Sequence, residues 1–482
     1  MVRLWPIHQR PGLAALGVAS VKPGDTVRFL TVWLVLLMVI PARLVIAPLG
    51  AAGAPALLLA VGGLFWWLNM NLLSGRILRP RPEPTLILVA ALVTAVLCSY
   101  VAAMTRPIDG LEVRAADRGV IKIVAWAAVV LLTVDGIATR DRLETLLRRF
   151  TVLGSVVAAV GVVQAFSGVD VTRYIIVPGL SANFEYATLL SRGGLNRPAG
   201  TATHPIEFGV VMAMVLPIAL HFALYSEPSA RLRRWIMVLL VGLAMALSVS
   251  RSAIVGEAVA FLILFVGWPA RRRLIALLFL PFGVVLVRLA VPGLVGTLLN
   301  LFTGISTDPS AGSRVSALPL AMSFVRAAPV FGRGFGTFLP SYVILDNQYL
   351  GFLIETGVVG LLLLLAFLAS GVWAGRAGAL ASPDAAGRDL GYSLAAASAV
   401  PLVTFVTFDA LSFPMAAALG FFVVGSAAAF ARIQKGHPAV IATPGIRVFS
   451  VAALARLRAR HPSTGSAERS PEPVEASDES TH

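Results

Sequence analysis

Three arginines near the ends of apolar runs are the residues of this sequence best suited to chemistry. Arg197 stands just before an apolar run, Arg251 follows the triplet 248–250 at a tight turn, and Arg314 opens an amphipathic stretch. Guanidinium is a planar fork of donors that matches phosphate oxygens. At membrane depth an arginine is costly unless it is paired or faces water. The set predicts an anion site, and the alternative is that each side chain extends separately to lipid headgroups.

Carboxylic acids inside apolar runs are the second candidates for chemistry. A structural hydrogen bond between helices is the simpler interpretation of each. Such acids can also carry protons or cations, so a secondary transporter or a lipid-linked glycan flippase stays open as the alternative function. The acids are Asp135, Glu207, Glu257, Glu355 and, at the edge of a run, Asp409.

The elements that must position these residues are membrane helices. Of 482 residues, 57% are hydrophobic and only 13% are charged, against about 25% charged in soluble domains. This excludes a water-soluble fold and predicts an all-α, polytopic membrane protein, since about 20 apolar residues cross a bilayer. Twelve runs of that kind occur at 27–47, 53–69, 84–103, 119–137, 150–167, 205–224, 235–250, 252–268, 274–291, 347–370, 390–408 and 411–431.

The distribution of Lys and Arg predicts the orientation of these runs. With the N-terminus inside, inner segments carry 25 Lys and Arg residues and outer segments carry 11, and short cytoplasmic loops hold the excess. Both termini are therefore expected in the cytoplasm. Two long segments, 168–204 and 292–346, are expected outside, and residues 313–328 are expected to form an amphipathic helix there. The net charge of +15 is then explained by arginines flanking the membrane, with no nucleic acid as partner.

The expected organisation is a cytoplasmic segment 1–26, a transmembrane domain 27–431 and a cytoplasmic tail 432–482. The tail is basic and then acidic, and its end cannot bury a core, so it is expected to be disordered. One cysteine, Cys98, excludes an internal disulfide. A P-loop, an HExxH motif and a Gly-x-Ser-x-Gly elbow are absent from the sequence. The glycine-rich run 332–336 lacks a preceding strand and is interpreted as a tight turn.

Three blocks of the sequence, covering roughly residues 150–430, resemble the O-antigen ligase and polymerase superfamily of bacterial membrane glycosyltransferases. The resemblance implies about twelve helices with a large outer loop between the ninth and tenth. The motifs of a second group of lipid-linked polymerases, the peptidoglycan polymerases of shape, elongation and division, do not match. The blocks are Arg197-Pro198-Ala199-Gly200 with His204-Pro205-Ile206-Glu207-Phe208-Gly209, then Ser248-Val249-Ser250-Arg251-Ser252, then Arg314 through 329–336 to Asp346-Asn347-Gln348-Tyr349-Leu350 and Glu355-Thr356-Gly357.

The resemblance implies glycan transfer in cell-surface polysaccharide synthesis. The donor would be a polyprenyl-diphosphate-linked glycan and the acceptor a glycan or glycolipid hydroxyl, at the outer face of the bacterial inner or plasma membrane. No nucleotide sugar, metal or other cofactor is implied, and membrane lipid is the remaining partner. Arginines would stabilise the charge that grows on the departing diphosphate.

The sequence departs from the ligase pattern at the start of the tenth run, where ligases that modify lipid A core have His-Asn and this chain has Asp346-Asn347. A carboxylate can accept a hydroxyl proton as imidazole does; the alternative is that Asp346 caps the helix. The expected catalytic residues are Asp346, Arg251 and Arg314. The expected substrate-binding residues are Arg197, His204, Asn347, Tyr349 and Glu355.

Overall fold

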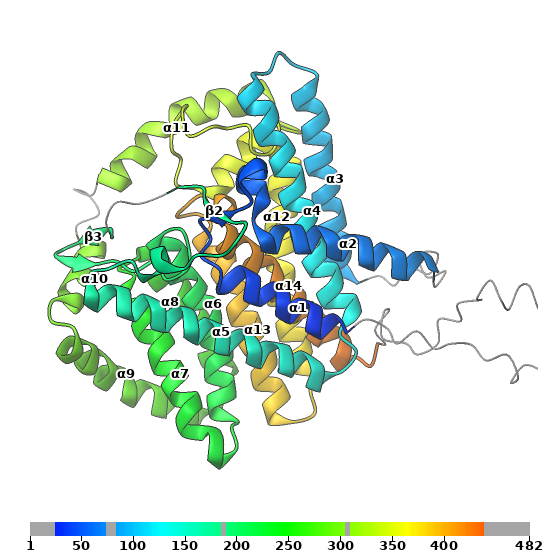
Figure 1. The fold of residues 1–482 in the computed structure, drawn as a ribbon. Helices are drawn as coiled ribbons and strands as arrows, with labels where there is room; N and C mark the ends of the chain where they lie inside the picture. The colour runs from blue at the N-terminus through cyan, green and yellow to red at the C-terminus, as the bar shows by residue number, and fades with distance from the viewer. Residues whose placement is uncertain (1–24, 74–82, 185–188, 304–308, 438–482) are drawn as a thin grey trace, which may run out of the picture. The chain divides into compact units, whose positions relative to one another are not determined.

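Helices make up most of the described part of the chain, which in this computed structural model comprises residues 25–73, 83–184, 189–303 and 309–437 (Figure 1). Four short strands form two separate antiparallel pairs. The expected cytoplasmic segment 1–26 lies outside the described residues except for its last two, and the tail lies outside them from residue 438.

Each of the twelve apolar runs overlaps a helix, although the run 27–47 is helical only as far as Met38. The helices, in chain order, are α1 (Thr26–Met38), α2 (Pro55–Leu73), α3 (Pro84–Met104), α4 (Gly110–Gly136), α5 (Arg140–Ser167), α6 (Pro205–Leu224), α7 (Pro228–Leu247), α8 (Arg251–Gly267), α9 (Ala270–Ala290), α12 (Gln348–Ala381), α13 (Ala385–Thr404) and α14 (Pro414–Gln434).

Six helices of the described residues are long and apolar enough to cross a membrane: α3, α4, α5, α6, α12 and α14. A bent pair formed by η1 (Ala47–Gly53) and α2, which meet at 72°, could be a seventh crossing. Helices α1 and α8, with 13 and 17 residues, are shorter than the roughly 20 residues that span a bilayer. A multi-pass α-helical membrane protein is therefore confirmed, but the expected count of twelve spans is not.

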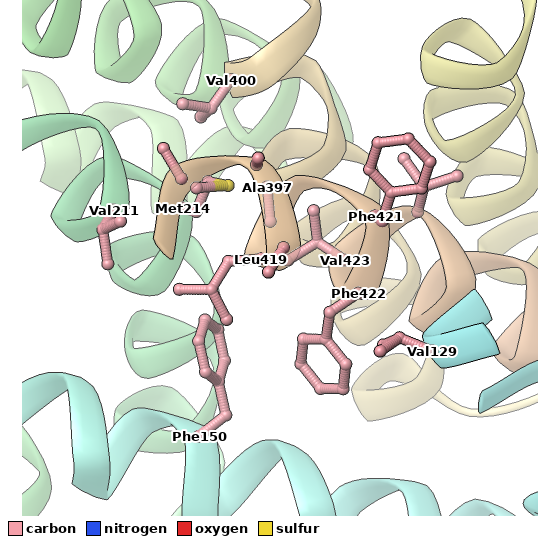
Figure 2. Close-up of a cluster of buried hydrophobic side chains, with 14 of the residues drawn as sticks. Val129, Phe150, Val211, Met214, Ala397, Val400, Leu419, Phe421, Phe422 and Val423 are labelled. Carbon is pink, nitrogen blue, oxygen red and sulfur yellow. The ribbon is translucent and has the colours of Figure 1, made fainter. Parts of the chain in front are cut away.

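Helix α14 forms the centre of the core. It packs against α3, α4, α5, α6, α12 and α13, and its residues are buried along nearly its whole length. Phe150 of α5, Leu419 and Phe422 fill the space between α5 and α14 (Figure 2), and the rings of Phe150 and Phe422 meet edge to face at 5.4 Å. A helix that is apolar on all sides is typical of such a central position.

The long segments predicted to lie outside pack against each other. Strand β1 (Leu44–Val45) pairs with β2 (Ser181–Ala182), and β3 (Ser191–Arg192) pairs with β4 (Leu195–Asn196). The second long segment contains α10 (Leu294–Thr303) and α11 (Pro309–Ala327). Leu195 lies in one apolar cluster with Leu294 and Leu298. Helix α11 confirms that a helix forms at about 313–328, but not that it is amphipathic.

A break in α12 anchors the glycine-rich turn. Gly357 has a positive φ of 67° inside the helix, and an added Cβ there would lie 2.1 Å from the Val330 carbonyl oxygen. The carbonyls of Ile354 and Glu355 accept hydrogen bonds from the backbone N–H groups of Arg333 (3.2 Å) and Gly334 (2.9 Å). The run 332–336 is therefore a close-packed turn, as predicted from its glycines.

The two long segments gather at the same end of the helices, and the side of the membrane can be tested with single cysteines. In a Cys98→Ala background, Ser181→Cys in the first long segment should react with an impermeant thiol reagent on intact cells. Ser229→Cys, at the start of α7 on the predicted inner side, should react only after permeabilisation, because short cytoplasmic segments hold the arginine excess. Both serines are exposed. If only Ser229→Cys is labelled on intact cells, the orientation in the membrane is the opposite of the predicted one.

Candidate functional site

A polar cavity of about 370 Å³, here called cavity A, lies under the first long segment. Three arginines from separate parts of the chain border it: Arg43, Arg173 and Arg197. One carboxylate, Asp170, also lines it. Its Oδ1 accepts hydrogen bonds from the Thr172 amide (3.0 Å), the Thr172 hydroxyl (2.7 Å) and Gln164 Nε2 (2.8 Å).

Arg197 is the most deeply placed cation of cavity A. Its side chain is only 9% exposed, and Nε donates to the Ser248 carbonyl at 3.0 Å. No described residue accepts a hydrogen bond from its Nη atoms. Burial, together with the charge of the nearby Arg192, lowers the pKa of Arg197 to about 10. The group is still cationic at neutral pH and needs an anionic partner to offset its desolvation.

The wall of cavity A is held by Gln164 at the end of α5. Its amide exchanges two hydrogen bonds with Gly200, N–H to Oε1 at 2.7 Å and Nε2 to the carbonyl at 3.0 Å. The Thr201 hydroxyl donates to the Met38 carbonyl at the end of α1. The chain between Arg197 and α6 is therefore fixed to two helix ends, which sets the position of the guanidinium.

The structure brings together two of the three predicted arginine blocks. The Ser248 carbonyl that contacts Arg197 lies three residues before Arg251, the first residue of α8. Arg251 itself does not line cavity A. Arg314 lies in α11, and its side chain is outside the described part of the structure. Convergence of all three on one anion therefore stays a prediction.

A second cavity of about 340 Å³, cavity B, lies between α4, the glycine-rich turn and the start of α12. Asn347 and Glu355, both predicted from the sequence, line it together with Arg118 and Lys122 of α4. Asp409 lines it from the turn before α14. Burial raises the pKa of Asp409, and the charge of Asp346 raises it further.

The start of α12 is capped by Asn347 rather than by Asp346. The Asn347 side chain accepts a hydrogen bond from the Leu350 amide at 3.1 Å, so the capping role considered for Asp346 belongs to its neighbour. Asp346 has a positive φ of 44°, a conformation that Asp and Asn adopt more readily than other residues with side chains. The alternative interpretation of Asp346 as the cap is therefore wrong.

Three predicted substrate-binding residues have structural contacts. The Tyr349 hydroxyl donates to the Leu402 carbonyl at 2.6 Å and does not line either cavity. His204 caps α6, because its Nδ1 accepts from the Ile206 amide at 3.1 Å. Burial lowers the pKa of His204 to about 4, with a contribution from Arg197. The Glu355 carboxylate accepts from the Phe338 amide at 3.2 Å while lining cavity B.

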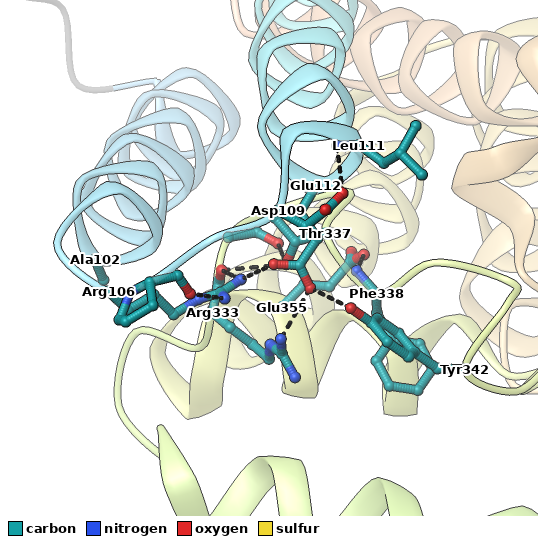
Figure 3. A network of polar contacts seen from close by, with 12 residues as sticks. Ala102, Arg106, Asp109, Leu111, Glu112, Arg333, Thr337, Phe338, Tyr342 and Glu355 are labelled. Atoms are coloured by element: carbon teal, nitrogen blue, oxygen red, sulfur yellow. Dashed lines mark hydrogen bonds and ion pairs between the residues drawn. The ribbon is translucent and has the colours of Figure 1, made fainter.

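A buried ion network holds the loop above cavity B (Figure 3). Glu112, at 2% exposure, accepts from Arg106 at 2.7 Å, Arg333 at 2.9 Å and the Tyr342 hydroxyl at 2.6 Å. The Arg333 guanidinium also lies 4.4 Å from the Phe324 ring centroid. A buried carboxylate with two cations resists separation of its partners, so the network ties α4 to the 333–342 loop.

Two of the acids inside the apolar runs, Asp135 and Glu207, are bonded to groups that join neighbouring segments, whereas Oε2 of Glu257 is buried without a hydrogen-bond partner among the described residues. Asp135 accepts from Trp67 Nε1 at 3.0 Å. Glu207, fully buried, accepts from the amide and hydroxyl of Thr203 and from the amides of Met415 and Ala416. These are the contacts expected of structural acids.

Sequence reasoning did not assign roles to several cations that line the cavities. Arg43 and Lys122 lie in the apolar runs 27–47 and 119–137, Arg118 directly precedes the second of these runs, and Arg173 lies in the long segment 168–204. A usable signal existed for α4, because Arg118 and Lys122 are four residues apart and so share one helical face. An ionisable residue inside a membrane segment is itself an indication of function.

Comparison with known proteins supports the resemblance. Residues 235–365 match the family model Wzy_C, described as O-Antigen ligase. The match runs from α7 into α12 and includes Arg251, Asp346 and Glu355, but not Arg197. None of the curated protein sequences matches the chain. The match supports the resemblance to the O-antigen ligase superfamily that the motifs had indicated.

The His204 cap makes stability depend on pH. Its pKa falls from 6.5 to about 4 in the folded chain, so the unfolded chain binds the proton more tightly. The contribution is complete above about pH 6.5 and is lost as the pH falls toward about 4. We expect the thermal midpoint in detergent to fall over this window. His204→Asn, which caps but does not titrate, should show a smaller fall, and equal falls in both proteins would contradict the assignment.

Proposed function

We propose that this chain, which is similar to the O-antigen ligase family over residues 235–365, is a membrane glycosyltransferase of cell-surface polysaccharide synthesis. It transfers a glycan from a polyprenyl-diphosphate carrier to an acceptor hydroxyl at the outer face of the inner or plasma membrane. The observation that carries the proposal is the buried Arg197 guanidinium on cavity A, whose Nη atoms have no acceptor among the described residues. A diphosphate supplies the charge and the oxygens that this group lacks.

The arginines act on the leaving group. When the acceptor oxygen attacks the anomeric carbon, the bond from that carbon to the diphosphate oxygen breaks, and the electron pair leaves with the diphosphate. Arg197, with Arg43 and Arg173 on the same cavity, stabilises the charge that develops there. Fixed donors in a site that excludes water contribute most when they are oriented in advance, and the Ser248 contact orients Arg197.

Asp346 takes the proton of the acceptor hydroxyl. The residue lies between Leu345 and Asn347, which both line cavity B, and its charge acts on Asp409 in the same wall. Because Asn347 is the helix cap, the Asp346 carboxylate is not needed for that role. The proton passes from the hydroxyl to this carboxylate as the new glycosidic bond forms.

The two cavities have one segment of the chain as a common neighbour. The segment 408–416 contacts the walls of both. Its Phe413 ring lies 5.9 Å from the His204 ring, beside Thr203 and Pro205 of cavity A. Asp409 and Ser412 of the same segment line cavity B. Donor and acceptor held on the two sides of this segment would meet near the start of α12.

Arg197→Met separates a functional arginine from a structural one. Methionine keeps an unbranched stem but removes a buried charge, so we expect an unchanged or higher thermal midpoint. Donor binding should weaken at least about tenfold, since hydrogen bonds to charged groups contribute about 1.5–3 kcal/mol. Both are measured on purified protein, with Arg326→Gln, an exposed arginine of α11, as control. A lower midpoint with unchanged binding of polyprenyl diphosphate would make Arg197 structural.

Asp346→Asn tests the proton acceptor. Asparagine tolerates the left-handed backbone of this position and cannot accept the proton, so the variant should fold and bind donor normally. Turnover on a lipid-diphosphate glycan should fall by about two orders of magnitude or more. Asn347→Asp, which retains a capping side chain, is the matched control for the helix start. Near-normal turnover of Asp346→Asn would remove Asp346 from the mechanism.

A further inference from the structure

Two arginines from neighbouring helices approach one buried aromatic ring on the predicted inner side. Phe222, near the end of α6, is 5% exposed, and its ring centroid lies 5.3 Å from Cζ of Arg148 on α5 and 5.8 Å from Cζ of Arg234 on α7. The three helices pack against one another, so this contact is a fixed part of the fold. Each cation is attracted by the ring, but the charge of Arg148 acts unfavourably on Arg234.

An acidic side chain compensates only one of these two arginines. Arg148 donates to Glu144 Oε2 at 2.7 Å, and the other oxygen of that carboxylate accepts from Arg140 at 2.8 Å. Arg234 has no hydrogen bond or ion pair with any of the described residues, and its Nη1 is buried without an acceptor. A partly buried cation without an anionic partner is costly. The contacts therefore leave a place for an anion at Arg234.

Both arginines lie where the apolar part of their helix begins. Arg148 stands two residues before the apolar run 150–167, and Arg234 stands directly before the run 235–250. Side chains on a helix tilt toward its N-terminus, and both helices start on the predicted inner side, so both guanidinium groups extend toward that surface. This is the level of the lipid headgroups, which arginine reaches while its stem stays among hydrocarbon.

Apolar side chains continue from each arginine toward the middle of the membrane. On α5, Val152 and Val156 follow Arg148 at intervals of four residues and are exposed, so they share its face of the helix. On α7, Val238 lies four residues after Arg234 and is half-buried. A ligand that fits this surface carries an anionic group at one end and hydrocarbon at the other.

We infer that the inner ends of α5, α6 and α7 form a binding site for an anionic phospholipid of the inner leaflet. The phosphate binds to Arg234 and, across the Phe222 ring, to Arg148, and the guanidinium donors match its oxygens. An acyl chain of the lipid lies along Val152 and Val156. Neither arginine lines cavity A or cavity B. The inference therefore does not depend on the proposed function.

Counting of bound lipids tests this site. The purified full chain in neutral detergent is titrated with phosphatidylglycerol, and in parallel with phosphatidylcholine, and bound lipids are counted by native mass spectrometry. We expect a first phosphatidylglycerol to bind more tightly than phosphatidylcholine, and Arg234→Met to weaken this step about tenfold or more, because a charge-assisted contact is lost. Arg148→Gln should weaken it too, and its half-exposed side chain makes misfolding a poor explanation. Arg271→Gln, an exposed arginine of α9, is the matched control and should bind as the wild type does.

Three outcomes would overturn the inference. Unchanged binding of phosphatidylglycerol to Arg234→Met and Arg148→Gln would mean that each arginine contacts headgroups separately. Equal affinity for phosphatidylcholine would mean that the site does not select an anionic lipid. Displacement of the lipid by millimolar inorganic phosphate would make it a site for free phosphate.

Thermal unfolding gives a second, independent measurement of the same site. A ligand that binds only the folded state stabilises that state, so phosphatidylglycerol should raise the thermal midpoint of the wild type and of Arg271→Gln. The increase should be smaller in Arg234→Met. Equal increases in all three proteins would contradict the site even if Arg234→Met has a different midpoint without lipid.

Discussion

The buried carboxylate of Glu207 is the contact on which the arrangement of both cavities depends. It accepts two hydrogen bonds from Thr203 and two from the first amides of α14. The first amides of a helix have no partner within it and favour negative charge, so one acid satisfies the start of α14 and the end of the first long segment together. Because an unpaired buried carboxylate is costly, these segments cannot separate, and cavities A and B stay on the two sides of residues 408–416.

The same requirement, that polar groups at membrane depth find partners, explains the break in α12. Gly357 ends the first part of the helix and releases carbonyls that would otherwise accept bonds within it. The Ser99 hydroxyl and the backbone of the glycine-rich turn donate to them instead. The turn is thereby fixed against α12, and Glu112 fixes the loop that follows it through Arg333. The glycine-rich turn beside cavity B is thus held by carbonyls of α12 that would accept hydrogen bonds within the helix if the helix were continuous.

The sequence predicted the features that depend on local pattern. Apolar runs located the helices, and glycine spacing located the tight turn at 332–336, because both follow from the chain's immediate neighbours. The roles of Asn347 and His204 were not predicted, since a capping residue is identified by the amide that it reaches. Periodicity shows that Arg118 and Lys122 share a face, but not which surface that face meets. The number of crossings could not be fixed either, because apolar length alone does not distinguish a short buried helix such as α1 from a span.

The backbone is strained at the turn between α7 and α8, next to the contact that orients Arg197. Among the described residues, Val249 and Asp346 are the two non-glycine positions with positive φ, at 46° and 44°. For a β-branched residue such a conformation costs about 1–3 kcal/mol and persists only where the surroundings enforce it. Val249 is fully buried between Leu294 and the ends of α7 and α8. Its conformation ends the chain's helical course just after α7, and the carbonyl of Ser248, the C-cap of α7, accepts a hydrogen bond from Arg197 Nε. The packing of the second long segment on this turn is therefore coupled to the orientation of the guanidinium, so that the loop between α9 and α12 acts on cavity A without lining it.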